Sequence, residues 1–194
     1  SNAGEQVTTV HPQLQSYEGR SFVSTDSIDF SLLDLVFLAL PHGESAALIA
    51  QLDPNLKVVD LGADFRLSSA EKWAQYYGGT HAGTWTYGLP ELPGNRAVIA
   101  KSTRVANPGC YATSISLAIA PALTLIDTSD IVVVSASGTT GAGRSAKVNL
   151  LGSEVMGSLS SYKFGGVHQH TPEIEEALSH AAGSEVKISF TPIL

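Results

Sequence analysis

Cys110 is the residue of this chain whose type and position predict chemistry most directly. It follows Pro108 and Gly109, which form a tight turn, and a helical pattern begins directly after it. The unpaired N–H groups and the dipole of a helix N-terminus favour an anion, so a thiol there ionises more readily than a free one. The sequence therefore predicts a nucleophilic thiolate. The alternative is a buried, inert cysteine.

Two histidines are candidates for the proton partner of this thiol. His168 and His170 stand just before a predicted helix, and in an extended segment their side chains point to the same face. One of them would act as a general base or acid, and the other would bind an anion. The alternatives are helix capping, core packing or a zinc site. Because the sequence shows no third and fourth zinc ligand, we predict no metal.

Two arginines are candidates for holding an anionic group. Arg144 follows a glycine-rich run at 138–143, whose backbone N–H groups would form an anion-binding nest. The run differs by one residue from the phosphate loop of nucleoside triphosphatases, which requires lysine where this chain has arginine. Arg66 lies in a loop after a predicted strand and would grip a carboxylate or phosphate through two hydrogen bonds. A salt bridge with Asp64, or a solvated surface position, is the alternative for Arg66.

The composition excludes several classes of partner. The chain has 194 residues, a formal net charge of −7 and 43% hydrophobic residues, which suits a globular protein without a basic surface for nucleic acid. No apolar run reaches the roughly 20 residues of a membrane span. A single cysteine cannot form an internal disulfide, so we expect a reducing, cytoplasmic setting. Residues 1–3 resemble the remnant of an expression tag, and the natural protein is expected to be longer.

The elements that position these residues alternate between strand and helix. Strands are expected at 34–40, 57–61, 131–137 and 185–191, with at most a short one at 21–23. Helices are expected at 44–52, from Ser68 or Ser69 to about 77, at 111–125, and at 173–182 with Thr171 as N-cap and Pro172 first. The runs at 34–40 and 57–61 are nearly continuously apolar, as in strands buried on both faces. This order predicts an α/β fold with a parallel sheet, whose ligands bind near loops 41–43 and 62–66.

Six segments, taken together and in order, resemble the N-acetyl-γ-glutamyl-phosphate reductase family of arginine biosynthesis. The segments are 36–43 (VFLALPHG), 62–67 (GADFRL), 87–91 (YGLPE), 107–111 (NPGCY), 137–144 (SGTTGAGR) and 166–173 (GVHQHTPE). They occur in the order of the family and are spread along the chain from about residue 34 onward. The resemblance implies a partial Rossmann-type parallel sheet in residues 4–107. It also implies the start of an α+β catalytic and dimerisation domain in residues 108–194.

The same resemblance implies an oxidoreductase that uses NADPH to reduce N-acetyl-γ-glutamyl phosphate to the semialdehyde with release of phosphate. Cys110 would attack the acyl phosphate and form a thioester, with His168 as its acid/base partner. Substrate contacts are expected from Arg66, Arg144, Tyr162 and His170, and cofactor contacts from Pro41, His42, Gly141, Ala142 and Gly143. Members of this family are homo-oligomers, so self-association is expected.

The sequence departs from the family at its N-terminus. The family opens with a glycine-rich dinucleotide-binding turn, and this chain has no G-x-x-G-x-x-G segment. The family also continues past the point that matches residue 194, so we expect a central fragment. Such a fragment would bind NADPH weakly or not at all, because the pyrophosphate lacks its helix N-terminus. Two alternatives stay open: an incomplete fragment that serves as an assembly module, and a reductase of acetyl-aminoadipyl phosphate, whose substrate differs by one methylene.

Overall fold

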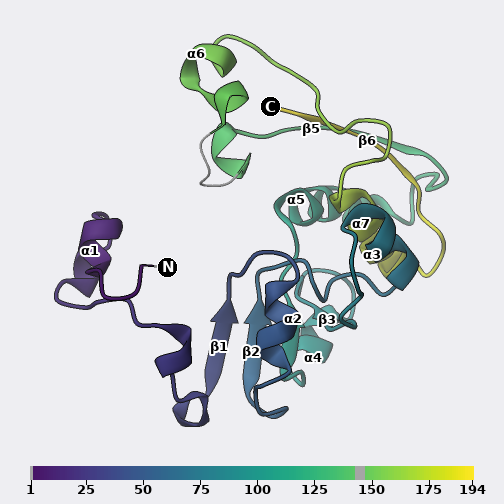
Figure 1. Cartoon of the computed structure of the whole chain (residues 1–194). Coiled ribbons are helices and arrows are strands. Elements are labelled where there is room, and N and C mark those ends of the chain that lie inside the picture. The colour runs from purple at the N-terminus through teal and green to yellow at the C-terminus, as the bar shows by residue number, and fades with distance from the viewer. Residues whose placement is uncertain (1, 143–146) are drawn as a thin grey trace. The chain divides into compact units, whose positions relative to one another are not determined.

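The computed structural model describes residues 2–142 and 147–194 (Figure 1). Its internal contacts divide the chain into two compact units, Ser1–Asp34 and Leu35–Leu194. The domain boundary expected between residues 107 and 108 lies inside the second unit, and the division into 4–107 and 108–194 stays a prediction.

The first unit is built around one short helix and a loop that returns to it. Helix α1 (Val7–Val10) follows an antiparallel bridge between Gln6 and Ser21, and Val7 is buried. Three 3-10 helices follow: η1 (Gln15–Tyr17), η2 (Thr25–Ser27) and η3 (Phe30–Leu32). The expected short strand at 21–23 is reduced to the isolated bridge between Gln6 and Ser21, beside which Phe22 exchanges backbone hydrogen bonds with Gly4 and Glu5.

A four-stranded parallel sheet forms the first half of the second unit. Its strands are β1 (Leu35–Leu38), β2 (Lys57–Asp60), β3 (Thr86–Tyr87) and β4 (Arg104–Ala106), in the spatial order β1-β2-β4-β3. The connecting helices are α2 (Glu44–Ile49), α3 (Ala70–Tyr76) and α4 (Asn95–Ile99). Ser69 caps α3 by accepting the N–H of Lys72, as expected. The α/β class and the parallel sheet are confirmed, whereas β3, β4 and α4 are too short to leave a periodic pattern in the sequence.

The prediction that the strand at 34–40 is buried on both faces is wrong for β1. Leu38 is only 4% exposed, but Leu35 and Phe37 are 44% and 65% exposed. Alternate side chains of a strand point to opposite faces, so Leu35 and Phe37 share one face of the sheet. Within the described residues that face is open, and β1 lies at the edge of the sheet. A continuous apolar run identifies a strand, whereas burial of each face depends on layers that other residues must supply.

Two buried carboxylates fix the loops at the carboxyl ends of β1 and β2. Asp60 Oδ1 accepts the Ser45 hydroxyl at 3.0 Å and the Gly62 N–H at 2.9 Å, and burial raises the pKa of Asp60. Asp64 accepts the N–H of Gly43 at 2.9 Å, where a φ of +89° favours glycine. The two loops expected to face a ligand are therefore tied to each other.

The second half of this unit packs two helices against a pair of parallel strands. Its elements are α5 (Cys110–Ile119), η4 (Ala120–Ala122), β5 (Ile131–Ala136), η5 (Thr139–Ala142), η6 (Val148–Leu150), α6 (Gly152–Val155), α7 (His170–Ala182) and β6 (Ile188–Ile193). Helices α5 and α7 lie side by side (Figure 1). Their core with β6 contains Tyr111, Ala112, Ile115, Leu123, Ile174, Leu178, Val186, Ile188 and Phe190. Helix α5 stops short of the expected residue 125, because Pro121 lacks the N–H that would continue it.

The start of α7 differs from the predicted cap. The helix begins at His170, so Thr171 lies inside the first turn and Pro172 is not its first residue. His168 takes part in the capping instead, because its Nδ1 accepts the backbone N–H of His170 at 3.0 Å. Pro172 still lies in the first turn, where backbone N–H groups have no hydrogen-bond partner within the helix. The absence of an N–H in proline therefore costs no helical hydrogen bond there. Among the described residues, no helix has the length and apolar character to cross a membrane.

Candidate active site

One cavity of about 720 Å³ brings six of the sequence-predicted site residues together. Its walls include Cys110, His168, His170, Tyr162, His42 and Gly141. Sites for small molecules in proteins have volumes of about 300–1,000 Å³, so this cavity can enclose a metabolite. The cysteine and the two histidines therefore belong to one site, although about sixty positions separate them along the chain.

The thiol of Cys110 is exposed and stands at the first residue of α5. Gly109, the N-cap residue, is extended, with φ −66° and ψ 159°. The imidazole of His170 packs directly on Gly109, because a Cβ built at Gly109 would lie 2.7 and 2.8 Å from two of the ring carbons. Only a residue without a side chain fits between His170 and the start of the helix.

Replacing Gly109 by Ala is expected to lower the free energy of unfolding by about 1–3 kcal/mol, because the new methyl group overlaps the His170 ring. Urea unfolding measures the change. The double variant Gly109→Ala/His170→Ala is the matched control, since loss of the ring makes room for the methyl group and the two costs should be less than additive. Fully additive costs would contradict the steric explanation.

His168 is a buried, neutral imidazole with a defined orientation of its hydrogen-bonding groups. Its side chain is 6% exposed, and burial lowers the pKa of His168 to about 4; the charge that His170 carries when it is protonated and the positive charge of Lys163 act in the same direction. Because Nδ1 accepts the N–H of His170, the neutral ring carries its proton on Nε2. The group that His168 can offer to a ligand is therefore an N–H donor.

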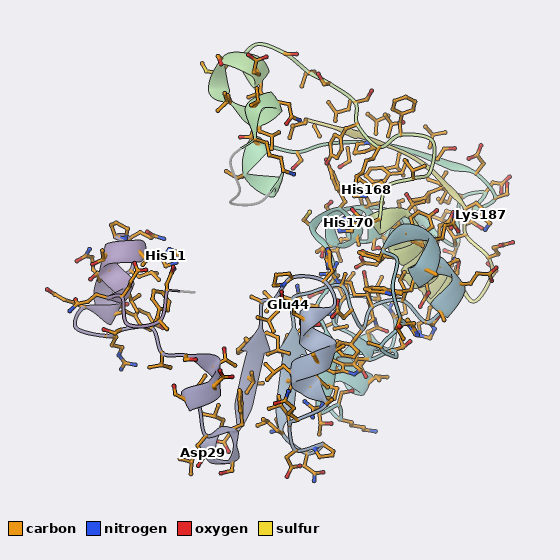
Figure 2. All side chains as sticks on the ribbon, viewed as in Figure 1. His11, Asp29, Glu44, His168, His170 and Lys187 are labelled. Atoms are coloured by element: carbon orange, nitrogen blue, oxygen red, sulfur yellow. The ribbon has the colours of Figure 1, made fainter. Side chains whose placement is uncertain are left out.

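Aromatic side chains surround the two histidines. Figure 2 shows His168 and His170 next to each other, and their ring centroids are 5.0 Å apart. Tyr111 contacts His168 and His170 edge-on, with centroid distances of 5.4 and 6.2 Å. The Tyr162 hydroxyl donates a hydrogen bond to the Tyr111 hydroxyl at 3.1 Å. Burial, the hydrogen bond with Tyr111 and the charge of Cys110 raise the pKa of Tyr162, which keeps this phenol neutral.

His170 is also a neutral ring in this structure. Burial lowers the pKa of His170 to about 4, and the positive charges of Arg66, His42 and Lys163 add to that effect. Within the described residues, its buried Nδ1 has no hydrogen-bond partner. A neutral imidazole can offer a hydrogen bond to an anion but not a charge. The role of His170 in holding an anion stays a prediction, with a hydrogen bond rather than a charge as the interaction.

Arg66 does not line the cavity. Its side chain is buried, and it donates from Nε to the Asn107 carbonyl at 2.7 Å and from Nη2 to the Leu61 carbonyl at 2.9 Å. Its Nη1 atom forms an ion pair with Glu173 at 3.3 Å, instead of the one considered with Asp64. The three nitrogens of the guanidinium are thus engaged within the protein.

The remaining predicted contacts have mixed positions. Arg144 and Gly143 lie outside the described residues, and Ala142 is the last residue of η5. Pro41 lies in the loop before α2, and the cavity wall includes its neighbour His42 rather than Pro41 itself. Among residues 2–142 and 147–194, no group of three His, Cys, Asp or Glu side chains is arranged to hold a metal ion.

Two lysines of the cavity wall were not found by sequence reasoning. Lys147 and Lys163 line the cavity together with Cys110. Lys163 has a φ of 45°, which is uncommon for a residue with a side chain, and its Nζ donates to Gln169 Oε1 at 2.8 Å. Both lysines stand in segments without helix or strand periodicity, so only their positive charge signals a possible anion contact.

Comparisons with known protein families match most of the chain to two family models. Residues 1–102, more than half of the chain, match a family model described as semialdehyde dehydrogenase, NAD binding domain. Residues 110–194 match the model of the semialdehyde dehydrogenase dimerisation domain. The first match indicates a nicotinamide nucleotide as cofactor, and the second indicates a domain through which members of the family dimerise.

Individual proteins are also similar to this chain, in sequence or in fold. Proteins named N-acetyl-gamma-glutamyl-phosphate reductase from Acidothermus cellulolyticus and Frankia casuarinae are 62% and 59% identical over 100% of this chain. The chain spans 57% of the length of these relatives. Aspartate semialdehyde dehydrogenase II from Vibrio cholerae, at 14% identity, shares the fold with a TM-score of 0.63 over 91% of this chain and 56% of that one. The chain therefore belongs to the semialdehyde dehydrogenase family.

Proposed function

We propose that this chain carries the reacting centre of an NADPH-dependent N-acetyl-γ-glutamyl-phosphate reductase, which converts the acyl phosphate to the semialdehyde. The observation that carries the proposal is the shared cavity, whose wall includes both the exposed Cys110 thiol and the neutral His168. Relatives with this name that match the whole chain support the choice of substrate. The single cysteine suits a reducing, cytoplasmic setting.

Cys110 acts as the nucleophile of the first half-reaction. Its thiol loses a proton to solvent, and the Sγ thiolate attacks the carbonyl carbon of the acyl phosphate, so that a C–S bond forms and the carbonyl electrons move to oxygen. The oxyanion then collapses, the C–O bond to phosphate breaks, and phosphate leaves with the electron pair. A thioester remains on Cys110, and one difficult step has become two easier ones.

His168 stabilises the oxyanion of this intermediate through its Nε2–H. A hydrogen-bond donor that is already in place needs no reorganisation as negative charge develops on oxygen. The neutral state of the ring suits this role, since its pKa of about 4 leaves it uncharged at neutral pH. The acid/base role expected for His168 thus becomes that of a donor to the reacting oxygen.

NADPH, when bound, supplies the hydride that reduces the thioester. The residues present fit the nicotinamide end of this cofactor, because His42 and Gly141 line the same cavity as Cys110. A Cβ added at Gly141 would lie 2.7 Å from Ser137 Oγ, so the Ser137 hydroxyl would have to move to admit a side chain there. When the C–S bond breaks, the aldehyde leaves and Cys110 regains its thiolate.

Positive side chains of the cavity wall bind the anionic groups of the substrate. Lys147 and Lys163 supply the charge, and Tyr162 and His170 supply neutral hydrogen-bonding groups beside them. Arg144 is a further candidate for the phosphate. Arg66, with its nitrogens occupied, is better suited to holding the protein around the site.

The proposal is tested by the release of phosphate from N-acetyl-γ-glutamyl phosphate in the absence of NADPH. A reacting Cys110 releases about one phosphate per chain and then stops, because the thioester is not reduced. Acetyl-aminoadipyl phosphate, one methylene longer, is expected to react about 10- to 200-fold more slowly. Phosphate release no faster than spontaneous hydrolysis would refute the proposal, and the reverse order of the two rates would reassign the substrate.

A second candidate function is that of an assembly module. It is favoured by the match of residues 110–194 to a dimerisation domain and by the exposure of Val132 and Val134, 72% and 64%, on one face of β5. Sedimentation analysis of the chain measures self-association directly. A stable homo-oligomer that releases no phosphate from either acyl phosphate would favour this function over the reductase.

A further inference from the structure

Glu173 is a carboxylate buried near the turn that carries the nucleophile. Its side chain is 1% exposed, and it lies in the first turn of α7. Its Oε1 atom accepts the backbone N–H of Gly109 at 2.8 Å and the hydroxyl of Tyr87 at 2.9 Å. Its Oε2 atom pairs with Arg66 Nη1 at 3.3 Å. One carboxylate thus gathers three donors from three separate segments of the chain.

The same network holds the turn before Cys110 from its other end. Arg66 donates from Nε to the carbonyl of Asn107 at 2.7 Å. The peptide groups of Asn107 and Gly109 are therefore both tied to the Arg66–Glu173 ion pair, one through a carbonyl oxygen and the other through an N–H. Since Cys110 is the next residue, this pair fixes the backbone on which the thiol stands.

A buried ion pair is a costly way to stabilise a fold. Removing two charges from water is only partly repaid by their attraction, and apolar side chains of similar size often stabilise a fold as well or better. Here the carboxylate has its donors in place, and Tyr87 stays a donor because burial and the charge of Glu173 raise the pKa of its phenol. A network of this kind defines the relative positions of the groups that it joins.

We propose that Glu173 is a positioning residue for the nucleophile, which acts by holding the Gly109 N–H and, through Arg66, the Asn107 carbonyl. This inference rests on the proposed function of Cys110. It gives Arg66 a supporting role in place of direct contact with substrate. It also joins the two matched regions of the chain, because Arg66 and Tyr87 lie within residues 1–102 and Glu173 lies within residues 110–194.

The test uses alkylation of Cys110 by iodoacetamide, which reports on one site because the chain has a single cysteine. Glu173→Asp keeps the charge but withdraws the carboxylate by one methylene, whereas Glu173→Gln keeps the shape and removes the charge. A displaced turn loses the benefit of the helix N-terminus. We expect both variants to react roughly three- to tenfold more slowly at neutral pH, with the half-point of the pH profile at higher pH.

A purely electrostatic role for Glu173 predicts a different pattern. Removing a negative charge near a thiolate favours the thiolate, so Glu173→Gln would then react faster and Glu173→Asp would match the parent. That pattern, or parent-like pH profiles in both variants, would overturn the proposal. Glu175→Gln is the matched control: it lies in the same helix and loses the charge of the more exposed pair with Lys72, at 4.0 Å, while its amide oxygen can still accept the Ile188 N–H that Glu175 accepts at 3.3 Å.

Two further measurements cover the cases in which the Glu173 variants do not fold or the proposed function is wrong. If the Glu173 variants fail to fold by circular dichroism, Tyr87→Phe removes a single hydrogen bond of the network and should shift the pH profile in the same direction by a smaller amount. A parent-like profile for Tyr87→Phe in that case would count against the proposal. If the proposed function itself is wrong, the result is different: Cys110 of the parent chain then reacts with iodoacetamide no faster than free cysteine does.

Discussion

Replacing Cys110 by Ser is expected to abolish phosphate release from N-acetyl-γ-glutamyl phosphate, with a loss of at least about 10³-fold relative to the parent chain. A serine hydroxyl at this position is a far weaker nucleophile than a thiolate, and no other cysteine can replace it. The rate of phosphate release, corrected for spontaneous hydrolysis, measures the effect.

The stability of the Cys110→Ser variant serves as its own control. The thiol is exposed, so the change of one atom should leave the free energy of unfolding within about 0.5 kcal/mol of the parent. Loss of activity in a fully folded variant then assigns the chemistry to Sγ. Phosphate release at the parental rate by Cys110→Ser would show that another group attacks the acyl phosphate.

Replacing His168 by Ala is expected to slow the same reaction by about 10²–10³-fold, which is the usual cost of losing one donor to an oxyanion. His168→Gln is the informative partner variant, because its amide retains an N–H donor of similar reach but has no basic nitrogen. Under the donor role we expect glutamine to recover part of the lost rate. Equal losses for Ala and Gln would instead support a proton-transfer role.

The pH dependence of the parent provides a second view of His168. Its pKa of about 4 lies below the ordinary 6.5, so the folded state binds fewer protons than the unfolded state between these values. The stabilising contribution of the neutral ring is therefore present above pH 6.5 and is lost as pH falls toward 4. Urea unfolding across this range should show that slope, and it should be weaker in His168→Gln.

Long, patterned segments were predictable from the sequence alone. The apolar run that forms β2 and the Ser69-capped α3 follow local rules of hydrophobic pattern and capping, and the structure confirms both. β3 and β4 could not be found in this way, because two or three residues hold no period; β4 depends on pairing with β2, and β3 depends on pairing with β4. The exposed face of β1 could not be predicted for a similar reason. The residues of β1 specify a strand, but residues distant in the sequence decide whether its faces are covered.

The site was predictable where its signal is local. Cys110 stands out because a turn and a helix start adjoin it, and the spacing of His168 and His170 is visible in a short segment. Glu173 offers no such signal, since its partners Arg66 and Tyr87 are 107 and 86 positions away in the chain. For the same reason the sequence alone could not show that Arg66 is held by Glu173 rather than left free to bind a ligand.

The central claim is that the acyl group passes to the sulfur of Cys110. The direct measurement is the mass of the chain after mixing with N-acetyl-γ-glutamyl phosphate without NADPH, followed by digestion to locate the added group. We predict one acyl adduct on the peptide that contains Cys110, removable by hydroxylamine as a thioester is, and absent from Cys110→Ser. Phosphate release without an adduct on Cys110, or an adduct that persists in Cys110→Ser, would contradict the account.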